Sequence, residues 1–200
     1  MYRVTRLILS GGFAVVLLLG TFSAQSVAAV KMRPYSGIGV LQLTTSAIPD
    51  PIPIYDEPGI ARCCTLQQAV LHTLNAWLFG TGQPTSLLVT DRKGEWLEVE
   101  HDDAGRTGWV RQQRRWQFSH WDQFLKGKLV QFLPNSPKPL VQLVKRPEAT
   151  EGEPLSPQNP LKVIVVKEDW AYVMFDQHSA GWIRWRDRDG RLLIGLADGK

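Results

Sequence analysis

The sequence predicts an all-β protein built from two small sheet modules in tandem. Apolar and polar residues alternate in several short stretches, which is the period of a β-strand with one buried face. Proline, glycine and aspartate, the residues that favour turns, separate these stretches. The same order of strands and turns occurs twice, in residues 48–113 and again in residues 138–187. Two copies of one strand order therefore predict two modules of the same fold.

The first 29 residues have the three-part pattern of a secretory signal peptide. Arg3 and Arg6 precede an apolar stretch, residues 7–22, and small residues lead up to Ala29. We expect cleavage after Ala29, a periplasmic or secreted mature protein, and no membrane span in that mature protein. The alternative is an uncleaved anchor, but this stretch of 16 residues is interrupted by Ser10, Gly11 and Gly12, whereas a spanning helix needs about 20 apolar residues.

The charge balance argues against nucleic acid as a partner. The whole chain has a formal net charge of +4, with 23 Lys and Arg against 19 Asp and Glu. Removal of Arg3 and Arg6 with the signal peptide lowers the charge to +2. The basic excess therefore belongs mostly to the predicted export signal, and nucleic acid is not expected as a partner.

The first module is predicted to begin after a leader and to contain an insertion. Residues 30–47 show no clear period, so we expect a leader or linker there. The first module spans residues 48–125. Its insertion, residues 61–86, has apolar residues every three or four positions. This spacing predicts an amphipathic helix from Thr65 to Phe79, and the alternative is a long hairpin, favoured by the all-β surroundings.

Each module is predicted to contain a first strand closed at a proline and then a three-stranded meander. The first strands are residues 52–59 and residues 140–147. In each meander, Trp-x-x-Val is followed by a hairpin and then by Gly-Trp-Val or Gly-Trp-Ile. The two Trp-to-Gly spacings are 12 and 11 residues, a difference that a hairpin loop can accommodate.

The segment between the two motif regions, residues 114–139, is too aromatic for a flexible linker. We expect a turn of helix around His120 to Leu125, followed by a strand near Leu129. This segment would seal the first module or pack between the modules. The second module is assigned to residues 126–200.

The order of strands and motifs resembles the bacterial SH3-like family, often called SH3b. The resemblance covers residues 48–113 and 138–187 and rests on Trp-x-x-Val and Gly-Trp, which occur twice in the same order. It implies a small, strongly bent barrel of five or six strands for each module. Bacterial members commonly bind cell-wall peptides or accompany wall-cleaving enzymes, so the resemblance also implies a binding role in the cell envelope.

Strand alternation predicts which aromatic rings face outward, because alternate residues share a face. Leu97 and Val99 point inward in the first module, as Ala171 and Val173 do in the second. Large rigid rings on the opposite face are typical of recognition surfaces. The alternative is that these rings pack between the modules or cover the ends of the barrels. The candidate ligand-binding residues are Trp170, Tyr172, Trp182, Trp96, Glu98 and Trp109.

The two cysteines, Cys63 and Cys64, are adjacent, so a bond between them would close no useful loop in the unfolded chain. They are predicted to be small buried hydrophobes, a strained vicinal disulfide, or a bridge between two chains. A metal site would need more ligands, and His72 is the only nearby candidate, so no metal is expected.

The motifs of common catalytic sites are missing from the sequence. It contains no Gly-rich phosphate loop, no His-x-x-x-His pair and no Gly-x-Ser-x-Gly elbow. We therefore expect no enzyme and no cofactor. The predicted function is non-catalytic binding of a cell-wall peptide or an envelope protein. One alternative is a structural scaffold, and another is a thiol-dependent redox protein that uses Cys63 and Cys64.

Overall fold

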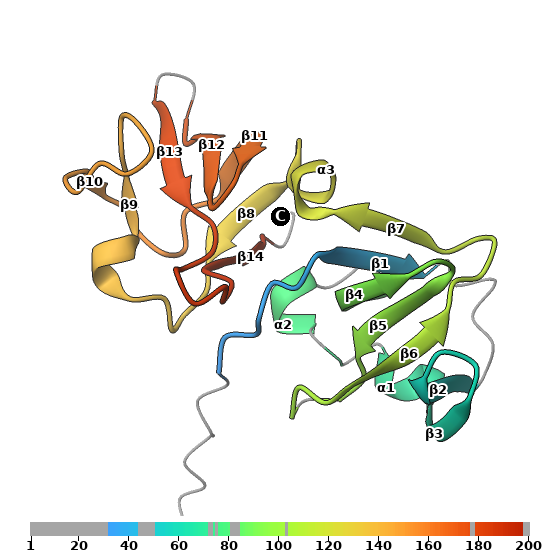
Figure 1. The fold of residues 1–200 in the computed structure, drawn as a ribbon. Helices are drawn as coiled ribbons and strands as arrows, with labels where there is room; N and C mark the ends of the chain where they lie inside the picture. Colours follow the sequence, from blue (N-terminus) through green and yellow to red (C-terminus); the bar gives the residue numbers. More distant parts are fainter. Residues whose placement is uncertain are drawn as a thin grey trace, which may run out of the picture. The chain divides into compact units, whose positions relative to one another are not determined.

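The fold is mostly antiparallel β-sheet with a few short helices (Figure 1), which confirms the predicted all-β class. The predicted signal peptide, residues 1–29, lies outside the described residues. The computed structural model describes residues 32–43, 51–71, 74, 76–80, 85–102, 104–176 and 179–197.

A seven-stranded sheet forms from the first part of the chain, in the order β3-β2-β6-β5-β4-β1-β7. Neighbouring strands run antiparallel. The strands are β1 (Gly39–Leu43), β2 (Ile52–Glu57), β3 (Ala61–Leu66), β4 (Thr85–Lys93), β5 (Trp96–Glu100), β6 (Thr107–Arg111) and β7 (Gln117–His120).

A five-stranded sheet forms from the second part of the chain, in the order β13-β12-β11-β8-β14. Its strands are β8 (Leu129–Phe132), β11 (Leu161–Lys167), β12 (Trp170–Met174), β13 (Ala180–Arg184) and β14 (Ile194–Leu196). A short hairpin of β9 (Gln142–Leu143) and β10 (Glu153–Pro154) lies beside β13. Two backbone hydrogen bonds of 2.8 Å between Val144 and Trp182 join this hairpin to β13.

The order of the strands in the second half matches that of the first sheet. With the hairpin included, the second half reads β10-β9-β13-β12-β11-β8-β14, and each strand is the counterpart of a strand in the first sheet. The registers match as well, because in each half the Trp of Trp-x-x-Val pairs with an arginine and its valine pairs with the glycine of Gly-Trp. These pairs are Trp96–Arg111 and Val99–Gly108 in the first half, and Trp170–Arg184 and Val173–Gly181 in the second.

Neither sheet is closed into a barrel within the described part of the chain. The end strands β3 and β7 of the first sheet do not pair with each other there, and neither do β13 and β14 of the second. The predicted closed barrels are therefore not confirmed, although the predicted meanders β4-β5-β6 and β11-β12-β13 are.

Strand β1 lies within residues 30–47, so the prediction of a leader or linker is wrong for this strand. β1 pairs with β4 on one side and with β7 on the other. Val40 packs in one hydrophobic cluster, and Leu41 and Leu43 pack in another. Because both faces of β1 are covered, its sequence shows no polar alternation, and the period that marks a half-buried strand is absent.

Two hydrophobic clusters cover the two faces of the central strands β1 and β4. One cluster includes Leu87 and Val89 of β4 together with Leu97 and Val99. Leu88 belongs to the other cluster, which also holds the inward residues of β11, β12 and β13. The second cluster therefore joins residues from both halves of the chain, and the two halves share apolar burial.

The predicted insertion, residues 61–86, contains a strand and two short helices rather than one helix from Thr65 to Phe79. Its first part is β3, which pairs with β2, and it continues with α1 (Gln68–Leu71) and α2 (Ala76–Phe79). The single helix is therefore wrong, and so is a hairpin running through the whole insertion. The apolar spacing arises because Leu71 and Leu74 pack in one cluster while Leu78 and Phe79 pack in the other.

The segment between the motif regions agrees with the prediction and adds one strand. Helix α3 (Trp121–Leu125) and strand β8 lie where a turn of helix and a strand were expected. Strand β7, which precedes α3, was not predicted. The expected strand over residues 140–147 is reduced to β9 and the bridge at Val144, preceded by a 3-10 turn, Lys138–Leu140.

Candidate functional site

Two aromatic rings lie side by side on the outer face of the second sheet. Tyr172 of β12 is paired in register with Trp182 of β13. The ring centroids are 5.4 Å apart and the planes are tilted by 59°, within the range of favourable aromatic pairs. Both residues are half-buried, so part of each ring is open to solvent.

Apolar side chains extend this pair across the sheet. Val165 of β11 is paired with Tyr172, and Met174 lies two residues along β12 on the same face. Leu129 of β8 shares that face, because it pairs with Lys162, which pairs with Met174. Val165, Met174 and Leu129 are 45%, 42% and 45% exposed. We call Leu129, Val165, Tyr172, Met174 and Trp182 the aromatic face.

An open hollow of ≈ 850 Å³ lies next to this surface along β13. Val144, which pairs with Trp182, and Ala180, which pairs with Met174, both line it. Sequence reasoning missed the hollow, because its walls come from the β9–β10 hairpin and from the residues just before β13. The remaining lining residues include Leu143, Lys145, Arg146, Ala149, Glu151, Glu153 and Ser179.

Trp170, predicted to bind ligand, is a structural residue in this arrangement. It is 8% exposed, and its indole Nε1 donates a hydrogen bond of 3.0 Å to Glu148. The guanidinium of Arg184 lies 5.1 Å from the centre of its ring. Since the loop that carries Glu148 folds over the indole, little of this ring is open to a ligand.

The three residues predicted in the first module lie close together but are occupied by other contacts. Glu98 pairs with Trp109 across β5 and β6, and its two carboxylate oxygens accept hydrogen bonds from Thr90 at 2.6 Å and Thr107 at 3.1 Å. Trp109 is 5% exposed, with the Lys93 ammonium 4.6 Å from its ring centre. The carboxylate therefore already has its partners and is poorly placed to receive an amino group.

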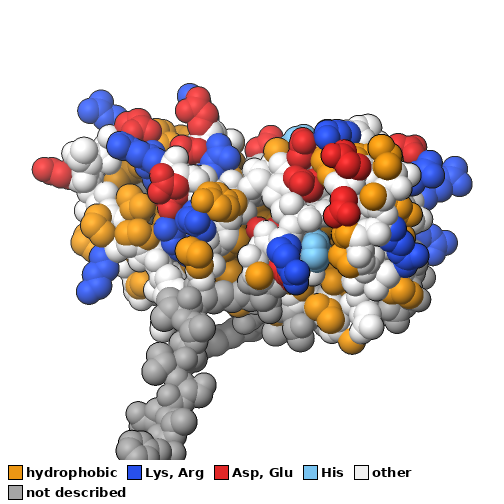
Figure 2. All heavy atoms as spheres, turned by 60° about the horizontal axis from the view of Figure 1, so that its bottom comes forward, with side chains coloured by type: hydrophobic (Ala, Val, Ile, Leu, Met, Phe, Trp, Pro, Cys, Tyr) orange, Lys and Arg blue, Asp and Glu red, His pale blue; other side chains and the backbone are white. Residues whose placement is uncertain are grey.

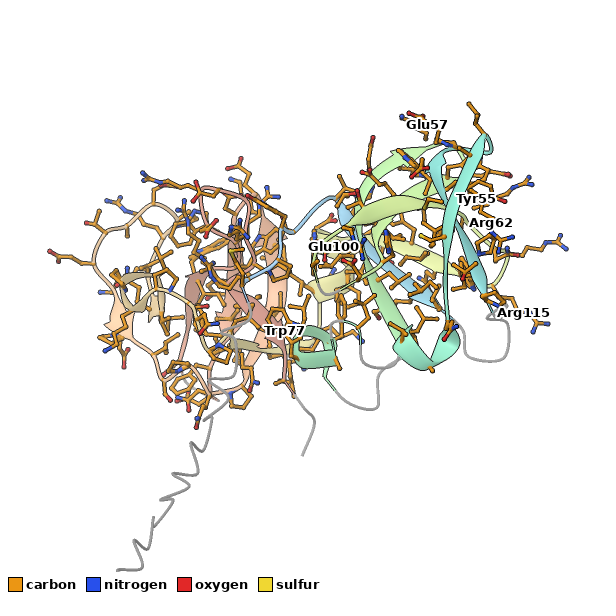
Figure 3. The ribbon with its side chains drawn as sticks, turned by 90° about the horizontal axis from the view of Figure 1, so that it is seen from below. Tyr55, Glu57, Arg62, Trp77, Glu100 and Arg115 are labelled. Carbon is orange, nitrogen blue, oxygen red and sulfur yellow. The ribbon has the colours of Figure 1, made fainter. Side chains whose placement is uncertain are left out.

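Trp96 is the most open of these three residues in the first sheet. It is half-buried, and its ring meets Tyr55 edge to face at 5.1 Å between centroids. Tyr55 lies on β2, where Figure 3 shows it near Glu57 and Arg62. In the second sheet, Val165 and Met174 extend the aromatic pair with apolar side chains. The corresponding positions of the first sheet carry the acidic residues Asp91 and Glu100.

Glu100 follows the inward-pointing Val99, so alternation predicts that it lies on the outer face of β5, yet it is buried. It is 7% exposed and lines a hollow of ≈ 210 Å³ with Trp77, Tyr35 and Arg191. Figure 3 labels Glu100 and Trp77, which come from β5 and α2. Glu100 does lie on the face opposite Val99, but residues 32–35 and Trp77 of α2 line the same hollow around it. The period of a strand does not predict such contacts from distant residues.

The two cysteines lie on β3 with their Sγ atoms 3.1 Å apart. Cys63 is exposed and Cys64 is half-buried, so the expectation of a small buried hydrophobe is wrong for Cys63. Partial desolvation, the hydrogen bond with Cys64 and the charge of Asp56 raise the pKa of Cys63 to about 11. At neutral pH this thiol is protonated, which opposes its use as a catalytic nucleophile.

Alkylation tests this protonation state. We expect iodoacetamide to modify Cys63 slowly at pH 8 and faster as the pH rises toward 11, because only the thiolate reacts. Substitution Cys64→Ser removes one group that raises the pKa and should accelerate the reaction by about tenfold at pH 8. Peptide mapping by mass spectrometry gives the rates. A wild-type rate equal to that of a free cysteine peptide would contradict the protonated thiol.

Other classes of site find little support in the described residues. None of the described His, Cys, Asp and Glu residues form a group of three suited to a metal ion. No described helix has the length and apolar character needed to span a bilayer. On the face drawn in Figure 2, charges of both signs are interspersed with hydrophobic side chains. His72, the candidate metal ligand near the cysteines, lies outside the described residues.

No model of a known protein family matches the chain, and no curated protein matches it. The aromatic face, the hollow beside it and the thiol pair are therefore the features of the described residues that can indicate a function.

Proposed function

We propose that this chain is an exported, non-catalytic binding protein of the bacterial cell envelope, periplasmic or secreted, built from two SH3-like modules. The matching strand orders and registers of the two halves support a tandem arrangement. In this proposal the first module begins at β1 and the second at β8, its counterpart. The export signal predicted from the sequence of residues 1–29 supports the location.

The aromatic face is the proposed binding surface, and the observation that carries the proposal is the open Tyr172–Trp182 pair flanked by exposed Val165 and Met174. Such rings bury a large area with little loss of side-chain entropy. The corresponding positions of the first half carry Asp91, Glu98 and Glu100. The two modules would therefore differ in role, with the second binding the ligand.

The proposed ligand is a cell-wall peptide, or else an envelope protein that presents an extended apolar segment. Backbone groups of such a segment could reach the hollow between the β9–β10 hairpin and β13, where Lys145, Arg146, Glu151 and Glu153 offer both signs of charge. A peptide carries both an ammonium and carboxylates, which suits such a mixed lining.

Retention on purified peptidoglycan tests the surface and the ligand together. We expect the wild-type chain without its signal peptide to be retained, and Tyr172→Ala and Trp182→Ala each to weaken binding by about tenfold or more. The matched control is Glu98→Gln, which changes the position in the first half that corresponds to Tyr172 and should leave retention unchanged. Circular dichroism checks that each variant folds.

Two outcomes would contradict this proposal in different ways. A wild-type chain that is not retained would reject the wall peptide as ligand. Retention that survives both aromatic substitutions would reject the aromatic face as the site.

A structural scaffold is the second candidate, and the burial of the tryptophans favours it. Most tryptophans of the chain serve the core rather than a surface. The buried ones are Trp109, Trp116, Trp121, Trp170 and Trp185. A scaffold would show no loss of any binding activity on substitution of Tyr172 or Trp182, so the same two variants separate the candidates.

A further inference from the structure

A β-bulge places both cysteine side chains on one side of strand β3. Side chains of adjacent residues in a regular strand point to opposite faces. In the β2–β3 ladder, however, Ile54 is paired with Cys64 and Tyr55 with Arg62, so Cys63 is an extra residue in β3. A bulge of this kind redirects a side chain. The two Sγ atoms consequently lie 3.1 Å apart.

The thiol pair is accessible to small molecules. Strand β3 is an edge of the seven-stranded sheet and pairs only with β2 in the described part of the chain. Cys63 is exposed, and most of β3 around it is exposed too. Cys64 is half-buried and packs against the hydrophobic cluster of the first sheet, so one sulfur faces solvent while the other is held by the core.

We infer that Cys63 and Cys64 form one reversible dithiol site, which reacts with small-molecule disulfides and closes to a vicinal disulfide. One thiolate attacks the reagent's S–S bond, forms a mixed disulfide and releases one thiol. The second sulfur, already adjacent, loses its proton, attacks the mixed disulfide and releases a second thiol. The chain loses two protons and two electrons, which together are two hydrogen atoms, and the reagent is reduced to two thiols.

The expected disulfide is labile rather than structural. The Cα atoms of adjacent residues are about 3.8 Å apart, whereas ordinary disulfides join Cα atoms about 4.4–6.8 Å apart. This mismatch strains the bond, and strained, exposed disulfides are readily reduced. The pair would thus respond to the redox state of its surroundings, and this inference does not depend on the aromatic face or on its ligand.

Reaction of the reduced chain with hydroxyethyl disulfide tests the site. At pH 9, where more thiolate is present, we expect a product lighter by two hydrogen atoms, resistant to iodoacetamide at both cysteines and free of any mixed adduct. Cys63→Ser and Cys64→Ser cannot close the ring and should each keep one hydroxyethylthio group, joined to the remaining cysteine by a mixed disulfide. Intact mass and peptide mapping distinguish these products, and dithiothreitol should restore both thiols.

The role of the bulge is tested by the same reaction on urea-unfolded chain. Because the fold holds the sulfurs together, the second step should be at least about tenfold faster in the folded protein. Equal rates would overturn the role of the fold. Stable mixed adducts on the wild type, disulfide-linked dimers, or a wild type that stays reduced while the single variants react would overturn the dithiol site.

Discussion

Substitution Trp121→Ala is expected to lower the free energy of unfolding by about 3–5 kcal/mol, the usual cost of removing a buried large aromatic ring. Trp121 is 6% exposed. Its ring packs against Trp185 and Phe124, with centroids 5.4 and 5.7 Å away. Its indole Nε1 donates a 2.6 Å hydrogen bond to the carbonyl of Ser36. The Trp121 side chain therefore contacts the segment before β1, helix α3 and Trp185 of the second half.

Two further variants divide this effect into packing and hydrogen bonding. Trp121→Phe keeps most of the apolar contact but leaves the Ser36 carbonyl without the indole, and we expect a loss of about 1–3 kcal/mol. Gln123→Ala, at an exposed position of the same helix, should change stability by less than about 0.5 kcal/mol. Urea unfolding followed by circular dichroism measures all three. Equal stabilities of Trp121→Ala and Gln123→Ala would show that α3 does not join the core.

Substitution Gly39→Ala is expected to cost about 2–3 kcal/mol, in the range found for overpacked sites. Gly39 lies in β1 between Val89 of β4 and His120 of β7. A Cβ at this position would lie 2.2 Å from the carbonyl oxygen of Ser119. Since that atom belongs to the backbone of β7, it can move away only if the whole strand shifts.

The same substitution distinguishes a sheet strand from a leader. A leader or linker at residues 30–47 would accept alanine at Gly39 without loss, and an unchanged urea midpoint would therefore contradict β1. The matched control is Gln42→Ala in the same strand, whose side chain is half-buried and whose backbone pairing is kept. We expect it to cost less than about 1 kcal/mol.

The meanders could be predicted because their signals are local. Leu97 and Val99, like Ala171 and Val173, are completely buried, as alternation predicted. Each meander consists of strands that follow one another along the chain, so a period of two and a turn between strands suffice to define it. The paired positions of Trp-x-x-Val and Gly-Trp follow from that geometry.

The residues that escaped prediction have partners far away in the sequence. The sequence of β1 shows no alternation of apolar and polar residues, because β4 and β7 flank this strand and hydrophobic clusters cover both of its faces. The glycines at positions 108 and 181 are likewise required by residues that are distant in the sequence. A Cβ at Gly108 would lie 2.4 Å from Ile54, and a Cβ at Gly181 would lie 2.8 Å from Leu143. The motif contained these glycines, and strands at Ile54 and Leu143 were predicted, but only the folded chain showed that those strands pass directly against the glycines.

The sequence by itself determined the all-β class, the two meanders and the set of rings on their outer faces. Only the tertiary structure decided which of those rings are open, since Glu148 covers Trp170, Lys93 covers Trp109, and Tyr172 and Trp182 are left partly free. The tertiary structure also places the Sγ atoms of Cys63 and Cys64 3.1 Å apart, through the β-bulge in β3 opposite Ile54. Alternation fixes the face on which a side chain lies, whereas its accessibility depends on loops and strands that are distant in the chain.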